Sequence, residues 1–154
     1  MDNETVGTPK GIVWASFVLS IVGVAISTYL TIAHYKGAEI LACADTGIVN
    51  CATVTTSAQS KFLGFPVSNL GLIFFMAMVV INSPWAWRRN SLLLDRIRAI
   101  GLLGGMGFVL WLIAAELLII DHICLWCTGV HVVTFTLLLV VSKTWTSELL
   151  RRSS

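Results

Sequence analysis

The sequence is poor in charged residues. Asp, Glu, Lys and Arg together make up 12% of its 154 residues, whereas 56% are hydrophobic. Soluble domains usually carry about 25% charged residues, and a soluble fold of this length has too little interior to hide so many apolar side chains. The net charge is only +2 and there is no basic patch with interleaved aromatic residues, so a nucleic-acid partner is not expected. The composition predicts a protein of the lipid bilayer.

Four apolar stretches predict four membrane spans, because each is close to the length of about 20 residues that a spanning helix needs. They cover residues 11–33, 65–81, 99–120 and 123–141. Transmembrane strands are not expected, since these stretches do not alternate polar and apolar residues. We therefore expect an all-α membrane protein, a single domain over residues 1–154 that folds as a four-transmembrane-helix bundle. The third span contains Gly101, Gly104, Gly105 and Gly107, which predict close helix packing.

The positive charges predict the orientation, because Lys and Arg accumulate in cytoplasmic loops. With the N-terminus inside, two of them, Lys36 and Lys61, lie outside and eight lie inside. The run from Arg88 to Arg98 is interpreted as a cytoplasmic loop that signals topology only. We expect a multi-pass protein of the plasma (inner) membrane with both termini in the cytoplasm. The eight inner charges are Lys10, Arg88, Arg89, Arg96, Arg98, Lys143, Arg151 and Arg152.

In this topology all four cysteines lie on the outer face, where disulfides persist. Cys43 and Cys51 fall in the first outer loop, over residues 34–64, and Cys124 and Cys127 follow a very short second outer turn. Residues 50–60 contain neither Gly nor Pro, so the first loop is predicted to contain a short helix with Asn50 as its N-cap.

Cys124-Leu125-Trp126-Cys127 is the strongest chemical signal in the sequence. This spacing at the start of a helix lets two sulfur atoms meet across one turn, and the partial positive charge of a helix N-terminus favours the reactive thiolate. A redox-active pair is the main interpretation, and an inert structural disulfide is the alternative. A zinc site fits less well, because the seven residues between Cys43 and Cys51 are too many for a zinc knuckle.

Two ionisable residues within the predicted spans are functional candidates. His131 lies four residues after Cys127 and therefore on the same helix face, although it could simply form a hydrogen bond to a neighbouring helix. Glu116, near the outer end of the third span, is interpreted first as an interfacial or helix-pairing residue, and a functional role is the alternative. Aromatic anchors at the membrane interfaces are predicted at Trp14, Trp85, Trp87 and Trp145.

Together these motifs resemble the vitamin K epoxide reductase family. Cys51 is followed six residues later by Ser57, Gly64-Phe65-Pro66 leads to Gly71, and a Cys-x-x-Cys opens the last of four helices. The resemblance covers residues 11–141 approximately and is closest in style to a stand-alone bacterial member. Such a member lacks the fused thioredoxin-like domain of many bacterial relatives, which implies a separate soluble partner.

The resemblance implies a thiol–quinone oxidoreductase. Cys124 and Cys127 match the active-site pair beside the quinone, and Cys43 and Cys51 match the shuttle pair. Ser57 matches a serine near the quinone, while His131 stands where animal members place a quinone-binding Tyr. The role of Asn69 is left open.

The implied electron acceptor is a quinone, menaquinone or another vitamin K-type molecule, and no metal is expected. The implied partner is a DsbA-like extracytoplasmic protein with a thioredoxin fold. A DsbB-type oxidase solves the same problem but has its tight cysteine pair in the first loop, the reverse of this order. The non-enzymatic alternative is a four-span scaffold whose outer disulfides are structural.

Overall fold

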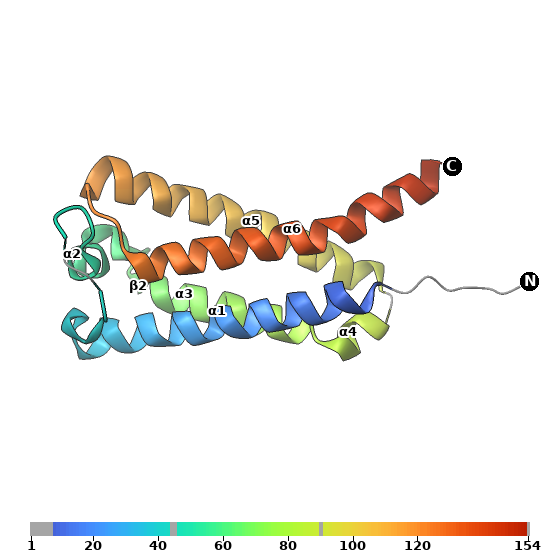
Figure 1. Cartoon of the computed structure of the whole chain (residues 1–154), viewed down its shortest axis with the longest axis horizontal. Coiled ribbons are helices and arrows are strands. Elements are labelled where there is room, and N and C mark those ends of the chain that lie inside the picture. The colour runs from blue at the N-terminus through green and yellow to red at the C-terminus, as the bar shows by residue number, and fades with distance from the viewer. Residues whose placement is uncertain (1–7, 44–45, 90, 154) are drawn as a thin grey trace, which may run out of the picture.

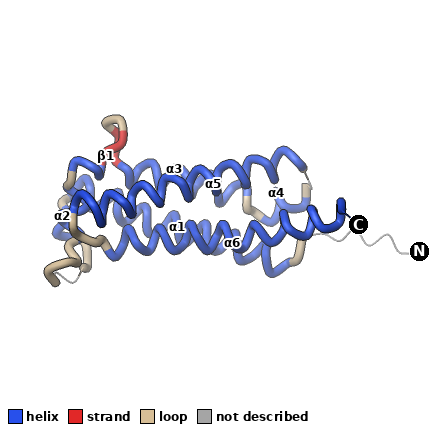
Figure 2. The backbone as a smooth tube through the Cα atoms, turned by 90° about the horizontal axis from the view of Figure 1, so that it is seen from above, coloured by secondary structure: helices blue, strands red, loops and turns tan. Residues whose placement is uncertain are grey.

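The computed structural model describes residues 8–43, 46–89 and 91–153. Three long apolar helices and one shorter apolar helix lie side by side in an elongated bundle (Figures 1 and 2). The predicted helical bundle is therefore confirmed, whereas the number of membrane crossings stays a prediction. The bundle helices are α1 (Lys10–Lys36), α3 (Val67–Ile81), α5 (Leu92–Ala115), which continues into a π-helical turn η3 (Glu116–Ile120), and α6 (Leu125–Ser153).

The four helices start and end differently from the apolar stretches. Helix α5 begins at Leu92, well before the predicted residue 99, and α6 continues to Ser153, well beyond residue 141. Helix α3 has 15 residues, which is about 22 Å at 1.5 Å per residue and shorter than a hydrocarbon core of about 30 Å. Hydropathy therefore locates the helices but not their ends. A charged residue ends an apolar stretch of sequence, but the helix itself can continue through it.

The interpretation of the run from Arg88 to Arg98 as a loop that signals only topology was wrong. Arg98 lies within α5 and is 1% exposed. Its guanidinium donates two hydrogen bonds to the carbonyl oxygen of Ile81, at 2.9 and 2.6 Å, and pairs with Asp95. Trp87 was predicted to anchor at the interface, but it is 7% exposed and its ring centroid lies 3.7 Å from the Arg98 guanidinium carbon. The charge can be buried because a carboxylate, a carbonyl and a ring surround it.

Close packing is confirmed for two of the four glycines in the third span. A Cβ at Gly101 would come within 2.7 Å of Met78, and one at Gly105 within 2.8 Å of Phe74. These contacts bring α5 against α3. The other two glycines have no such neighbour within 4 Å.

The first long loop folds over one end of the bundle, where Figure 1 shows α2 (Cys51–Thr56). Helix α1 starts and α6 ends at the opposite end (Figure 1). As predicted, the Asn50 side chain caps α2 by accepting a hydrogen bond from the Thr53 backbone at 2.8 Å. The helix stops at Thr56 rather than reaching Ser60, because Ser57 adopts an extended backbone and its hydroxyl bonds back to the carbonyl of Val54.

Short elements complete the loop. Two single 3₁₀ turns are η1 (Ala38–Ile40) and η2 (Ala58–Ser60). Strands β1 (Lys61–Phe62) and β2 (Phe65–Pro66) then form a small hairpin that projects from the bundle in Figure 2. Its two-residue turn places Leu63 and Gly64 at positive φ, as a tight hairpin turn requires. At the other end of the bundle, α4 (Pro84–Arg88) connects α3 to α5.

Candidate active site

The Cys-x-x-Cys motif opens α6, as the sequence predicts. Cys124 is the residue directly before the helix, and its sulfur accepts a hydrogen bond from the backbone N–H of Cys127 at 3.3 Å. The Cys124 carbonyl accepts two further hydrogen bonds from Thr128, both at 2.9 Å. Cys124 thus caps the helix where free N–H groups and the helix dipole favour a thiolate over a thiol.

The other two cysteines form a disulfide in the loop. Cys43 and Cys51 are bonded, with their Cα atoms 6.2 Å apart, whereas Cys124 and Cys127 are free thiols. Cys51 is the first residue of α2 and is 2% exposed, while Cys43 is half-buried. The more accessible sulfur of the disulfide is therefore the one farther from the helix.

Backbone hydrogen bonds hold the loop disulfide beside the start of α6. The N–H of Asn50 donates to the carbonyl of Ile123 at 3.1 Å, and the N–H of Ile123 donates to the carbonyl of Ile48 at 2.9 Å. Cys51 directly follows Asn50, and Cys124 directly follows Ile123. Both cysteines belong to one buried cluster, against which the other two cysteines also pack. The fold thus brings the two pairs together.

Two aromatic residues fasten the segment that leads into Cys43. The Tyr29 hydroxyl donates to the carbonyl of Ile40 at 2.7 Å and accepts from the N–H of Ala42 at 3.0 Å. The Trp126 indole N–H donates to the carbonyl of Ala42 at 3.1 Å, and the two rings meet edge to face at 4.7 Å. Trp126 lies inside the Cys-x-x-Cys motif, so one short segment carries both the thiols and a clamp for the loop. Trp126 was not among the residues that the sequence pattern singled out.

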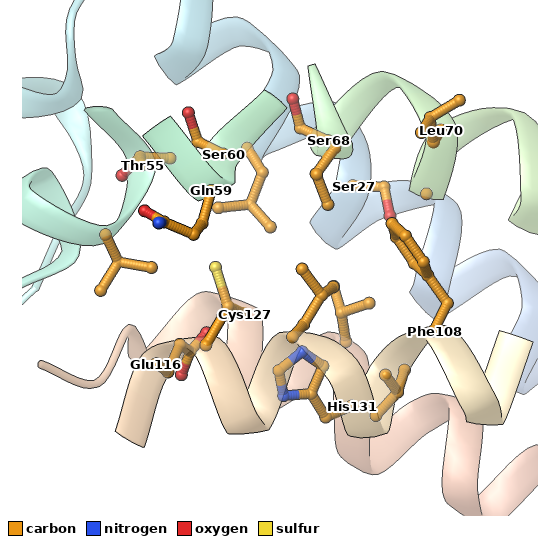
Figure 3. A pocket seen from close by; sticks show the side chains of 18 of the residues that line it. Ser27, Thr55, Gln59, Ser60, Ser68, Leu70, Phe108, Glu116, Cys127 and His131 are labelled. Atoms are coloured by element: carbon orange, nitrogen blue, oxygen red, sulfur yellow. The ribbon is translucent and has the colours of Figure 1, made fainter. Parts of the chain in front are cut away.

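A cavity of about 320 Å³ lies beside the second thiol. Cys127, His131 and Ser57 all contribute to its wall, which is predominantly apolar. Figure 3 shows the Cys127 sulfur pointing into the cavity and the His131 ring farther along the same helix. Three of the predicted site residues therefore meet at one space enclosed by α1, α3, α5, α6 and the α2 loop. Apolar residues of the wall include Leu30, Val54, Phe74, Phe75, Phe108 and Leu112.

The family of the chain follows from its match to a protein-family model. The model of the vitamin K epoxide reductase family matches residues 14–142, which is most of the chain. The chain belongs to this family. The resemblance inferred from the cysteine spacing is confirmed, and membership indicates a membrane thiol–disulfide oxidoreductase with quinone-related chemistry. No curated protein matches the chain.

The cavity of this family member has polar atoms that the sequence analysis did not select. Ser27 from α1 and Ser68 from α3 line it, and within the described part of the chain their hydroxyl groups have no hydrogen-bond partner. Ser27 is 1% exposed, so these are buried donors available to a ligand. Serine on a helix is too common to be selected from sequence alone. Asn69, whose role was left open, instead donates a hydrogen bond to the Tyr35 hydroxyl at 2.8 Å.

Glu116 is also part of this wall. It is 6% exposed, begins the π-helical turn η3, and its carboxylate lies beside the backbone of Cys124. The end of α5 thus turns the Glu116 side chain inward, and its role, whether interfacial, helix-pairing or functional, stays a prediction. Among the residues that the structure describes, no group of three or more His, Cys, Asp or Glu side chains is arranged to hold a metal ion.

Proposed function

We propose that this protein is a membrane thiol–quinone oxidoreductase that reoxidises a DsbA-like thioredoxin-fold partner and reduces a quinone. One observation carries the proposal. The free thiol of Cys127 opens into an apolar cavity, while Cys124, its partner in the motif, is packed in the cluster that contains the Cys43–Cys51 disulfide. Cys124 therefore lies between the Cys43–Cys51 disulfide and Cys127, whose thiol faces a cavity suited to an apolar ligand.

The accessibility of the sulfurs sets the order of the relay. A thiolate of the reduced partner attacks Cys43, the more exposed end of the disulfide, and releases Cys51 as a thiolate. When the second partner thiol attacks this mixed disulfide, the partner leaves oxidised. Cys51 and Cys43 then pass two electrons to a Cys124–Cys127 disulfide by the same exchange, which leaves Cys124 and Cys127 reduced. Each step breaks one S–S bond and forms one.

The cavity fits a quinone head group. Its volume of about 320 Å³ lies in the range of about 300–1,000 Å³ typical of small-molecule sites. Its apolar walls suit a flat ring, and the unpartnered hydroxyls of Ser27 and Ser68 together with His131 supply polar contacts for the two carbonyl groups. A quinone bound there accepts two electrons and two protons from the dithiol. Cys127 donates the electrons from the cavity side, and Cys124 closes the disulfide.

We infer that the chain crosses the membrane four times with the cysteines outside. The excess of Lys and Arg at the opposite end of the bundle from α2 supports this orientation. In a cysteine-free background, Leu63→Cys and Arg88→Cys place single thiols at two exposed positions. A membrane-impermeant maleimide should label the cysteine at position 63 in intact cells and the one at position 88 only after permeabilisation. The reverse pattern would invert the topology.

The scaffold alternative explains less. In a scaffold with structural disulfides, the Cys-x-x-Cys cysteines would staple the outer turn. Cys124 and Cys127 are free thiols, and one of them lines a cavity. A structural pair should ignore added quinone, whereas the proposed pair should cycle with it.

The test of the proposed function is reconstituted turnover. Purified protein in detergent is mixed with a reduced thioredoxin-fold protein and a menaquinone analogue, and quinol formation is followed by absorbance. We expect one quinol for each partner disulfide formed. Quinone reduction that is absent with every vitamin K-type quinone, although the cysteines remain reduced and the protein folded, would refute the proposal.

A further inference from the structure

Glu116 is buried without a charged partner of opposite sign. Within the described residues its carboxylate forms no ion pair. The ion pair found there joins Arg98 to Asp95 near the start of α5, whereas Glu116 follows the end of that helix. A buried carboxyl without a cation is costly, and an ionisable residue at such a depth is by default a functional candidate. Within the described residues, Glu116 therefore does not join two helices through a salt bridge.

Glu116 lies close to the residues proposed to carry out the reaction. Its carboxylate lies beside the backbone of Cys124, and its side chain lines the same cavity as Cys127 and His131 (Figure 3). A second hollow, between α5 and α6, is also lined by both Glu116 and His131. Besides Glu116, the titratable groups that face this space are Cys127 and His131 of α6 and His34 of α1. No Lys or Arg contributes to either wall in the described part of the chain.

The proposed reaction needs a carrier for protons in this space. When the Cys124–Cys127 dithiol becomes a disulfide, two S–H bonds break, one S–S bond forms, and the quinone gains two electrons and two protons. Cys127 faces the cavity directly, but Cys124 is 0% exposed and is not part of the cavity wall. The Cys124 proton therefore needs a group that contacts Cys124 on one side and the cavity on the other. Glu116 meets both conditions.

We propose that Glu116 accepts the proton of the Cys124 thiol and passes it across the cavity to the quinone. This inference rests on the proposed function. As a carboxylate Glu116 takes the Cys124 proton. The Cys124 thiolate then bonds to the Cys127 sulfur while Cys127 gives up its own proton and the electron pair of the dithiol passes to the quinone. As a carboxylic acid it then gives the proton up to a quinone oxygen and returns to its starting state. The π-helical turn at Glu116 supports this role, since such turns occur frequently at functional sites.

The first test measures the two half-reactions of Glu116→Gln separately. The amide keeps the size and shape of the carboxyl group but cannot carry a proton. Quinol formation by the pre-reduced protein should fall about 10²–10⁴-fold, the usual contribution of acid–base catalysis. Trapping of a Cys51–Cys124 mixed disulfide in a Cys43→Ser background, whose Cys124–Cys127 pair is first oxidised with diamide rather than quinone, should keep its wild-type yield. Glu116→Asp, which retains a carboxyl, should recover part of the lost rate.

The second test needs no quinone. In Cys127→Ala protein with the Cys43–Cys51 disulfide intact, Cys124 is the remaining thiol, and its thiolate is titrated by ultraviolet absorbance. Removing a neighbouring carboxylate favours the thiolate, so adding Glu116→Gln should move the midpoint to lower pH. A Glu116 that only packs in the wall, without interacting with the Cys124 sulfur, would leave that midpoint unchanged. Asp121→Asn, the same exchange at an exposed residue of the neighbouring turn, is the matched control and should change neither measurement.

The outcomes separate this inference from the proposed function. If wild-type protein does not reduce quinone, the proposed function fails. If wild-type protein reduces quinone and folded Glu116→Gln does so at a similar rate, the proton role of Glu116 is refuted while the proposed function stands. An unchanged thiolate titration in Glu116→Gln would also overturn it, because the carboxyl would then not sense Cys124.

Discussion

The two ends of the bundle both bury polar side chains, but they use them differently. At one end, Arg98 is satisfied by the Ile81 carbonyl, by Asp95 and by the face of Trp87. At the cysteine end, His131 is buried against the cavity, and the buried Ser27 hydroxyl has no partner within the described residues.

The difference separates structure from function. A buried polar group that already has all its partners can only hold helices together, and removing it should cost stability. A buried polar group that faces a cavity is held ready for a ligand, and removing it should cost activity. The predictions that follow test this division from the largest expected effect to the smallest.

The largest effect is expected for Cys127→Ala. Without the sulfur that faces the cavity no disulfide can form with Cys124, so quinol formation should be abolished. The half-reaction at the other pair should survive, and Cys43→Ser combined with Cys127→Ala should still cross-link Cys51 to Cys124 when a thiol oxidant such as diamide is added. The measurement pairs quinol absorbance with non-reducing electrophoresis after proteolysis. Quinone turnover that persists in Cys127→Ala would show that the cavity is not the site of electron transfer.

His131→Ala should slow quinone reduction by roughly 10²–10³-fold, since removing one donor aimed at developing negative charge typically costs ~2.7–4 kcal/mol. His131→Tyr supplies a donor again and should retain more activity than His131→Ala. His122→Ala, in the short segment between η3 and α6, is the matched control and should keep native turnover. If His131→Ala reduces quinone like the wild type, the residue only pairs with a neighbouring helix, a contact worth about 0.6 kcal/mol in membranes.

Arg98→Met should show the opposite profile. The Ile81 carbonyl loses its donors, and an unsatisfied buried acceptor costs about 1–3 kcal/mol. We expect a lower unfolding temperature in detergent with unchanged turnover per folded molecule. Arg96→Met, in the same helix but exposed, should leave the unfolding temperature in place. A strong loss of turnover in folded Arg98→Met protein would mean that the two ends are coupled and would break the comparison.

Sequence reasoning succeeded where the information is local. The position of Cys124 at a helix start, the Asn50 cap of α2 and the apolar character of the helices all follow from residues close together in the chain. The Cys43–Cys51 disulfide was implied by the family resemblance, and the structure contains it. The roles of Ser57 and His131 remain predictions, although both residues line the cavity.

Sequence reasoning failed where a partner comes from elsewhere in the chain. Arg98 looked like a loop charge because hydropathy cannot show that the end of α3 offers it a carbonyl oxygen. Trp87 looked like an interface anchor for the same reason, since the charge that covers its ring comes from α5. The Glu116 side chain points inward because a π-helical turn follows α5, and no local sequence pattern predicts that turn.

The smallest effect is expected for Trp126→Phe, which tests how rigidly the loop must be held. The substitution removes the hydrogen bond to the Ala42 carbonyl but leaves an aromatic ring to pack on Tyr29. One such hydrogen bond contributes about 0.5–1.5 kcal/mol, so the unfolding temperature should fall slightly. The rate of Cys51–Cys124 exchange should fall severalfold, because the segment before Cys43 is held less firmly. Quinone reduction by pre-reduced protein should not change, since the cavity wall is untouched. Equal losses in both half-reactions would show instead that Trp126 supports the loop and the cavity alike. The prediction that Trp126 holds only the loop would then be wrong.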